Sequence, residues 1–404
     1  MTTRPIPIKI ETFAGVLSDG VCSERWRTHT KGPRLVGARC LFVLILAVAC
    51  KPSHGRQHTN SIPSSPTSVI STAPTTSARS NEPEIVERKE RAMGTSVDII
   101  AYTNEAVDLE RTHSAIDRAM AEIERLEAEL SEWRDSSDIG RINQSGGTWV
   151  SVSPETLDVI EKALWVGRES HGSFDITFHS MGDLWKFGTA ADAKPEPPAP
   201  DEVRRHRARI DYRRVEIDRQ GSRVRIPHGR KIGLGGIAKG YIVDRAVGVL
   251  RAAGLRSFLV QAGGDLYAAG RKPDGTHWSA GIRDPRGPEG DSFATLELEN
   301  HAFSTAGDYA RAYVTGGKRF HHIIDPRTGY PATASRSVTI YAPDALTADM
   351  IDDAVFILGP EKGLALVNGL DGVGAVIVDA QNRVWVSSVL EAKVSIHKQP
   401  TDGI

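Results

Sequence analysis

The sequence predicts an α+β fold, because helical patterns and hairpin patterns come in separate blocks rather than in strict strand–helix–strand alternation. One observation is the helical spacing of apolar side chains across residues 115–130. A second is a pair of glycine turns, at Met93-Gly94 and Gln220-Gly221, each flanked by short strand-like segments. We therefore expect helices and sheets to form from separate stretches of the chain.

The first half of the folded region is expected to hold one hairpin and two helices. Residues 84–102 read as a strand, the Met93-Gly94 turn and a second strand. The helix at 115–130 is amphipathic, and one of its faces carries Ile116, Ala119, Met120, Ile123, Leu126 and Leu130. Ser153 is a helix N-cap followed by a proline at the first helical position, so a second helix should run from there to about Ser170.

The second half is expected to hold a hairpin, a helix and several more hairpins. The first hairpin covers residues 215–227. A helix that begins near Gly240 should end at Gly254, because a glycine there is typical of a helix C-terminus. A strand begins within residues 257–261, and further hairpins follow to about Ile340.

The composition is that of an ordinary globular protein, with 40% hydrophobic and 25% charged residues in a chain of 404. The formal net charge is −1, so bulk charge does not indicate a nucleic-acid partner, and we predict none. A basic run at 204–209 is local, and we interpret it as a solvated connector.

The N-terminal part predicts an export leader and a tether. Basic residues precede the apolar run 40–50, which is too short to span a bilayer permanently and ends in small residues and Cys50. This order resembles a bacterial lipobox, so residues 1–50 are expected to be an N-terminal extension with a lipoprotein signal peptide. Residues 51–84 are rich in Ser, Thr and Pro and predict a disordered tether before the folded domain at 85–395. We expect a lipid anchor to the cell membrane or outer membrane, facing the periplasm or extracytoplasmic side.

Residues 321–331 place two imidazoles, a carboxylate, a guanidinium and a hydroxyl in one short stretch. A core strand would not hold so many polar groups, because each buried one needs a partner. We interpret the stretch as a strand that delivers reactive groups to a loop at the mouth of a site, with an ion pair between Asp325 and Arg327 to fix the loop. The alternative is a hairpin with a polar turn.

Residues 231–240 form a glycine-dense loop that runs into the helix near Gly240. Glycines let backbone amides approach a phosphate, the helix dipole favours the anion, and Lys239 adds a positive charge. The pattern is neither a P-loop nor a dinucleotide fingerprint. The alternative is a glycine-rich helix entry selected for close packing.

The third cluster consists of Asp349, Asp352 and Asp353, which share one face if this segment is helical. Three carboxylates on one turn repel one another unless a cation lies between them. Oxygen-only ligands suit Mg²⁺ or Ca²⁺ rather than zinc. The alternative is a set of acids in a first helical turn, where the helix dipole favours them.

Together the three clusters resemble the ApbE-like family of flavin transferases, also called FAD:protein FMN transferases. The resemblance runs from about Arg91 to about Gly369. No single motif is decisive, but their order along the chain is strongly specific. The motifs lie at residues 93–95, 131–139, 172–177, 184–188, 235–240, 262–265, 304–309, 321–329 and 348–349.

The resemblance implies a two-lobed α+β fold of mixed and antiparallel sheets with helices, with the active site in the cleft between the lobes. It implies a Mg²⁺-dependent transfer of FMN from FAD, the substrate, to a threonine or serine of an acceptor flavoprotein subunit, with release of AMP. His322 matches the functional histidine, and a histidine can accept a hydroxyl proton near neutral pH. The alternative is that His322 only binds a phosphate or orients the loop.

The resemblance also implies two further sets of site residues. The expected Mg²⁺ ligands are a backbone carbonyl of Gly236 and the carboxylates of Asp349, Asp352 and Asp353. The expected FAD contacts are Met93, Trp133, Ser173, Phe174, Asp175, Lys239 and Ile324. Trp133 would stack a flat ring well, although it could equally anchor the end of the 115–130 helix.

Two positions depart from the family pattern. Asp353 stands where the family usually has threonine, and Gly233 stands where it usually has aspartate, so a contact with FAD is lost there. Two other functions stay open at this point. One is a Mg²⁺-dependent FAD pyrophosphatase, which uses water as the acceptor, and the other is a flavin-binding lipoprotein without chemistry.

Overall fold

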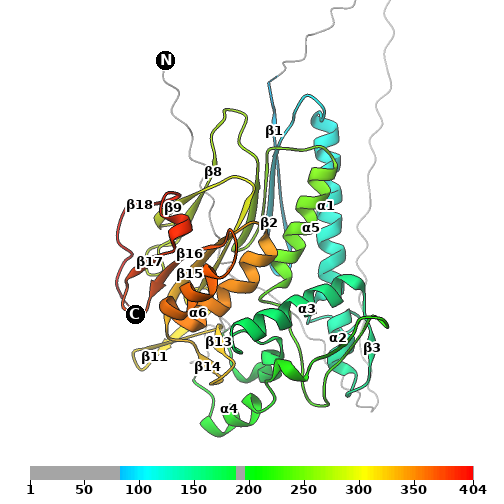
Figure 1. Ribbon diagram of the computed structural model, residues 1–404, viewed down its shortest axis with the longest axis vertical. Helices are drawn as coiled ribbons and strands as arrows, with labels where there is room; N and C mark the ends of the chain where they lie inside the picture. Colours follow the sequence, from blue (N-terminus) through cyan, green and yellow to red (C-terminus); the bar gives the residue numbers. More distant parts are fainter. Residues whose placement is uncertain (1–81, 188–195, 404) are drawn as a thin grey trace, which may run out of the picture. The chain divides into compact units, whose positions relative to one another are not determined.

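The structure is a computed structural model that describes residues 82–187 and 196–403. The predicted signal peptide, Cys50 and nearly all of the 51–84 tether lie outside the described residues. The α+β class and the antiparallel sheets are confirmed (Figure 1). Within the described part of the chain, no helix is both long and apolar enough to cross a membrane.

The main element is an eight-stranded sheet in which every neighbouring pair is antiparallel. In spatial order its strands are β1 (Ile85–Ala92), β2 (Thr95–Tyr102), β6 (Phe258–Ala262), β7 (Asp265–Ala269), β10 (His301–Gly307), β15 (Ser335–Ala342), β16 (Gly374–Asp379) and β17 (Val384–Val386). The predicted hairpin at 84–102 forms β1 and β2. Its turn has positive φ at Met93 (53°) and Gly94 (69°), which a glycine adopts at no steric cost.

The main sheet is buried on both faces. On one face, side chains such as Ile99 and Val260 pack with α1 (Leu109–Leu130), α5 (Ala238–Ala252) and α6 (Ala345–Asn368). On the other face, the alternate side chains, such as Leu259, pack against a small sheet. That sheet consists of β18 (Val394–Ile396), β9 (Ser292–Leu298) and β8 (Trp278–Arg283). Figure 1 shows α1 and α5 side by side, with β8 and β9 on the opposite side of the sheet.

Local capping sets the helix starts. Helix α1 begins six residues earlier than predicted because Asp108 caps it, accepting a hydrogen bond from the Arg111 amide. The six apolar residues of the predicted face are all buried. Helix α3 (Pro154–Glu169) begins as predicted, with Ser153 as its N-cap. The predicted 215–227 hairpin forms β4 (Glu216–Asp218) and β5 (Arg223–Arg225).

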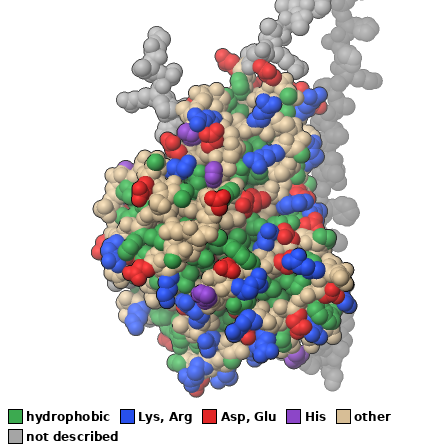
Figure 2. Space-filling model, viewed as in Figure 1, with side chains coloured by type: hydrophobic (Ala, Val, Ile, Leu, Met, Phe, Trp, Pro, Cys, Tyr) green, Lys and Arg blue, Asp and Glu red, His purple; other side chains and the backbone are tan. Residues whose placement is uncertain are grey.

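One prediction about the middle of the chain is wrong. The basic run at 204–209 is not a plain connector, because residues 204–207 form the last turn of helix α4 (Pro200–Arg207), which has proline in the first turn and acids at its N-terminus. The remaining described elements are α2 (Asp138–Gln144), β3 (Val150–Ser151), β11 (Ala312–Thr315), β12 (Lys318–His321), β13 (Ile324–Asp325), β14 (Tyr330–Pro331) and the 3₁₀ helices η1 (Ile176–Leu184), η2 (Tyr212–Arg214) and η3 (Ser388–Leu390). Basic and acidic side chains are interspersed on the face shown in Figure 2.

The C-terminal segment is tied to the β8–β9 connection by a buried carboxylate. Asp284 accepts hydrogen bonds from Lys398 Nζ at 2.9 Å and from the Thr401 hydroxyl at 2.8 Å. The backbone amides of Arg286 and Gly287 also donate to it. These hydrogen bonds outweigh the effect of burial and lower the pKa of Asp284 to about 2.

Candidate active site

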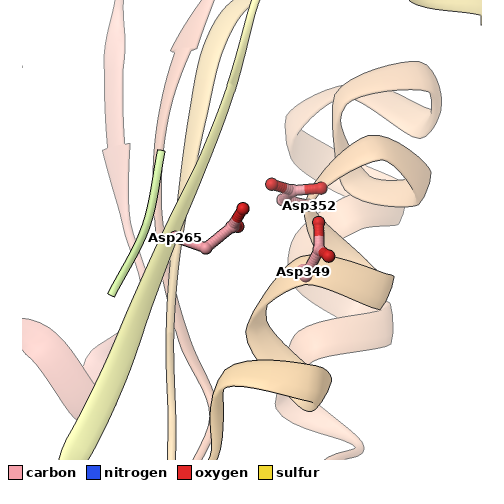
Figure 3. A group of neighbouring side chains, drawn as sticks. All are labelled: Asp265, Asp349 and Asp352. Carbon is pink, nitrogen blue, oxygen red and sulfur yellow. The ribbon is translucent and has the colours of Figure 1, made fainter. Parts of the chain in front are cut away.

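Three buried carboxylates meet where helix α6 crosses the beginning of strand β7. Asp265 is the first residue of β7, and Asp349 and Asp352 lie one turn apart on α6. One oxygen from each residue lies within 4.8 Å of the others, and no side chain of the three is more than slightly exposed. Figure 3 shows the two helix carboxylates pointing toward Asp265. We call these three residues the acidic centre.

A lysine neutralises part of this charge. Lys239 Nζ lies 2.6 Å from Asp265 Oδ2 and 3.2 Å from Asp349 Oδ1. The Gly240 amide donates to Asp349 Oδ2 at 2.8 Å. A side chain at Gly240 would place its Cβ 2.2 Å from the Ala345 carbonyl oxygen, so only glycine allows α5 and α6 to approach this closely. The helix-start amide that we predicted for a phosphate is therefore bound to a carboxylate.

Ser304 on β10 bridges the other side of the acidic centre. Its hydroxyl lies 2.6 Å from Asp352 Oδ2 and is also within hydrogen-bonding distance of Asp265 Oδ1. A hydroxyl has one proton, so it donates to only one carboxylate at a time. Ser304 therefore leaves the centre with more acceptor oxygens than donors.

Burial and crowding make the charged forms of the acidic centre unfavourable unless a cation compensates them. Burial and the neighbouring carboxylates raise the pKa of Asp349 and of Asp352 well above the ordinary aspartate value. Burial alone would lower the pKa of the Lys239 ammonium. The charges of Asp265 and Asp349 outweigh this effect, so the pKa is raised. Helix α6 begins at Ala345 and has no acid in its first turn, so the helix dipole does not explain these carboxylates.

Asp353 lies at the edge of the acidic centre, close enough to raise the pKa of Asp352 but beside Gly236 and Phe174. Its Oδ2 lies 3.0 Å from the position that a Cβ at Gly236 would take, and the Phe174 ring lies 3.1 Å from the same position. Gly236, Phe174 and Asp353 are thus neighbours, while Asp349 and Asp352 turn toward Asp265. Burial raises the pKa of Asp353 to about 6.

His322 follows strand β12, as expected for a strand that delivers reactive groups to a loop. Its backbone amide donates to the Arg311 carbonyl at 3.1 Å, and its Nδ1 is buried with no hydrogen-bond partner among the described residues. Burial, followed by the charge of Arg311, lowers the pKa of His322 to about 3, and Lys239 contributes. The imidazole is therefore neutral at pH 7, and its free Nδ1 lone pair can accept a hydrogen bond.

The other polar residues of the 321–331 stretch hold the local structure in place. His321 is buried, and its Nε2 lies 2.8 Å from the Ala332 carbonyl oxygen. The expected ion pair forms, with Arg327 Nη2 2.8 Å from Asp325 Oδ2 and Nε 2.9 Å from Oδ1. This pair fixes the loop after β13.

The other predicted FAD contacts differ in their solvent exposure. Trp133 is 78% exposed, and its ring lies edge-to-face with His179 at 6.0 Å. Both oxygens of Asp175 are already used, since they accept from the Thr177 and Tyr212 amides. Burial raises the pKa of Asp175, and these bonds identify it as the cap of η1.

Three further predicted contacts lie in or beside packed regions. Ser173 is buried, and its hydroxyl forms no hydrogen bond within the described residues. Ile324 packs with Trp185 in a small apolar cluster. Met93 rests half-buried against the main core. The described structure does not bring these three into the acidic centre.

Sequence reasoning missed one member of the acidic centre, Asp265, and the serine that bridges two of its carboxylates, Ser304. Asp265 was seen only as the end of the motif at 262–265, and Ser304 only as the start of the motif at 304–309. A signal for Asp265 was present, because an acid directly after two glycines at a strand start is unusual for a buried strand. Its partners are far away in sequence, so only the fold shows that it joins Asp349 and Asp352.

The fold and the site define an α+β protein with a buried, lysine-paired carboxylate centre and a neutral histidine. Residues 93–377 match the model of the ApbE family. The chain belongs to the ApbE family.

Among curated relatives, the FAD:protein FMN transferase of Treponema pallidum is 32% identical over 326 residues, which is 76% of this chain and 88% of the relative. The Escherichia coli FAD:protein FMN transferase is 27% identical, over 70% of this chain and 82% of the relative. The solved ApbE protein of Thermotoga maritima superposes with a TM-score of 0.69 at 32% identity, over 77% of this chain and 99% of that structure. The flavin transferase ApbE of Vibrio cholerae gives a TM-score of 0.66 at 26% identity, over 77% of this chain and 100% of that structure.

Proposed function

We propose that this protein is an FAD:protein FMN transferase that uses Mg²⁺ and modifies a threonine or serine of an acceptor flavoprotein. In this reaction the acceptor oxygen forms a bond to the phosphorus on the FMN side of FAD. The pyrophosphate P–O bond breaks, AMP leaves, and the hydroxyl proton passes to a base. The observation that carries the proposal is the acidic centre with Lys239, whose charge acts on the pKa of the neutral His322.

The acidic centre fits a magnesium ion by its donor chemistry. All of its ligand atoms are carboxylate oxygens, the type that Mg²⁺ prefers, and they outnumber the one lysine that pairs with them. Asp265, Asp349 and Asp352 would hold the ion, with the Gly236 carbonyl and Asp353 as further candidates. When bound, the ion neutralises charge on the pyrophosphate and on the leaving AMP.

His322 is the proposed general base. Its Nδ1 is buried and has no hydrogen-bond partner among the described residues, so it is available to a substrate hydroxyl. A neutral imidazole can take the acceptor hydroxyl proton only when that hydroxyl comes within hydrogen-bonding distance. We assign Lys239 two tasks, which are to hold Asp265 and Asp349 in place and to place a positive charge beside the phosphates.

The proposed FAD site lies around Trp133, Phe174 and the glycine loop at 231–240. Trp133 offers an open aromatic face, and Phe174 packs beside Gly236. An exposed tryptophan can stack a flat heterocycle. Met93, Ser173, Asp175 and Ile324 remain proposed contacts, with Asp175 acting through the backbone that it holds.

Mass spectrometry tests the function directly. The full-length protein is incubated with FAD, Mg²⁺ and a candidate flavoprotein subunit, and the subunit should gain the mass of FMN less one water while AMP appears in equal amount. Mg²⁺-dependent AMP release without a modified subunit would instead identify an FAD pyrophosphatase. FAD binding with neither product would identify a flavin-binding protein without chemistry.

We further propose that the protein is lipid-anchored at Cys50 and faces the extracytoplasmic side, with residues 51–84 as its tether. The support is the order of basic, apolar and small residues before Cys50. Several acyl chains would hold the protein firmly at a membrane, whereas a single chain binds weakly. Cys50→Ser should release the protein from the membrane fraction or stall its processing. Wild-type fractionation and migration of that variant would refute the anchor.

A further inference from the structure

The carboxylate of Glu132 lies over the glycine loop, in the space where Gly233 has no side chain. An ideal Cβ at Gly233 would lie 2.2 Å from Glu132 Oε2, and one at Gly235 would lie 3.8 Å from Oε1. The backbone of Gly233 is held in place, because its amide donates to the Ile176 carbonyl at 2.9 Å. Glycine at 233 thus makes room for an acid that comes from a distant part of the chain.

This carboxylate is short of hydrogen-bond donors. Its Oε2 is buried and has no hydrogen-bond partner within the described residues, and the nearest basic group is His179 Nδ1 at 3.8 Å. The side chain as a whole is only 16% exposed. A buried carboxylate oxygen without a donor is unfavourable, so the arrangement favours a ligand that supplies one.

The surroundings of Glu132 indicate what kind of ligand this is. The next residue is Trp133, whose ring is 78% exposed and lies 6.0 Å from the His179 ring. An open tryptophan face stacks flat rings, and a carboxylate beside it accepts N–H groups at the edge of such a ring. Flat heterocycles with N–H groups at the edge occur at both ends of FAD, as the imide of the flavin and as the amine of adenine.

We propose that Glu132 is a specificity-determining residue of the FAD site and accepts a hydrogen bond from the N–H group of a ring stacked on Trp133. The inference rests on the proposed function only in that FAD is the ligand. Glu132 follows the end of α1. Its carboxylate occupies the space that a side chain at position 233 would take, so it supplies the acid that position 233 lacks. A carboxylate carried by either position should therefore serve the same contact.

Binding measurements on the full-length protein test this inference. FAD and FMN affinities are measured by flavin fluorescence, and AMP affinity by calorimetry, for the wild type, Glu132→Gln, Glu132→Ala and the double variant Glu132→Ala/Gly233→Asp. Losing a charged hydrogen bond should weaken FAD binding about 10- to 100-fold in Glu132→Ala. The double variant should recover affinity to within a few-fold of the wild type, because an aspartate at 233 fills the vacated space. His179 Cβ, at 3.1 Å from the new Cβ, must shift only slightly.

The two smaller ligands distinguish the ends of FAD. A parallel loss of FMN affinity with unchanged AMP affinity assigns Glu132 to the flavin, and the reverse assigns it to the adenine. Glu124→Ala, which removes an exposed acid from α1, the helix that precedes Glu132, is the matched control and should bind all three ligands like the wild type. Thermal melting checks the fold of each variant. If Glu132→Ala does not fold, the affinities of the isosteric Glu132→Gln are compared with the control instead.

Failure of the inference differs from failure of the proposed function. If the wild type binds FAD and Glu132→Ala binds it within two-fold of the Glu124→Ala control, the inference is wrong. The same holds if the single variant loses affinity and the double variant recovers none. If the wild type itself binds neither FAD, FMN nor AMP, the proposed function is wrong.

Discussion

The Asp352→Asn substitution distinguishes a metal site from a structural network at the acidic centre. Asparagine keeps the shape and can still accept the Ser304 hydroxyl, but it removes one of the crowded charges. In chelator the variant should therefore melt at a higher temperature than the wild type. In excess Mg²⁺ the order should reverse, because the variant has lost a charged ligand.

Both magnitudes follow from the structure. Two unit charges 4.8 Å apart, the upper separation within the centre, repel by about 3 kcal/mol at an effective dielectric constant of about 20. Relieving the repulsion should therefore stabilise the apo variant by at most about 3 kcal/mol, and by less at a pH where the raised pKa of Asp352 leaves it protonated. Mg²⁺ at 100 times its dissociation constant stabilises the wild type by about 2.7 kcal/mol. For a body of about 300 residues the unfolding entropy is roughly 0.6 kcal/mol/K, which converts that stabilisation to a shift of about 4 °C.

The assay is thermal unfolding, followed by calorimetry or circular dichroism, in chelator and across a Mg²⁺ titration. Asp371→Asn makes the same chemical change at an exposed position and should melt like the wild type under both conditions. A wild type that gains nothing from Mg²⁺ would refute the metal assignment. So would an Asp352→Asn protein that is several degrees less stable in chelator, since the carboxylate would then be part of a structural network.

Three further outcomes are expected. His322→Ala should lower FMN transfer on the order of 10²-fold, the usual scale for a general base, while FAD still binds; a near-normal rate would remove His322 from the mechanism. The pKa of His322 is about 3 in the folded protein and 6.5 ordinarily. The contribution of its neutral form to the free energy of unfolding should therefore be complete above pH 6.5 and fall as pH drops toward 3. The urea midpoint of His322→Asn should therefore fall less than the wild-type midpoint between pH 6.5 and 5, and equal falls would contradict the lowered pKa. Asp284→Ala should cost about 2–4 kcal/mol and speed hydrogen exchange at residues 398–401, whereas unchanged exchange would show that the carboxylate does not hold the C-terminal segment.

Features that depend on near neighbours in the chain were predictable from the sequence. The apolar face of α1 and the Ser153 cap of α3 were predicted because the residues that interact lie within one or two helical turns. The β1–β2 turn was predicted because Met93-Gly94 must reverse the chain by itself. The start of α1 was missed, since a lone Asp108 gives a weaker signal than a serine followed by proline.

The order of the motifs was enough to predict the family, but not how the site residues meet. Helical spacing placed Asp349, Asp352 and Asp353 on one face, whereas the packing of α6 against β7 and α5 turns only the first two toward Asp265. The i, i+3 and i+4 spacing identifies residues on one face of a helix, but it contains no information about which residues of other elements that face contacts.

Long-range contacts decided the rest. Lys239 pairs with Asp349, 110 positions away, and Ser304 reaches Asp352 across 48 positions, because the register of the antiparallel sheet brings β7 and β10 under α6. Glu132 likewise fills the space at Gly233, which is far from it in the sequence. The sequence by itself determined the fold class, the elements that depend on near neighbours and the family. The tertiary structure alone decided which charges are neighbours, because that depends on the packing of segments far apart in the chain.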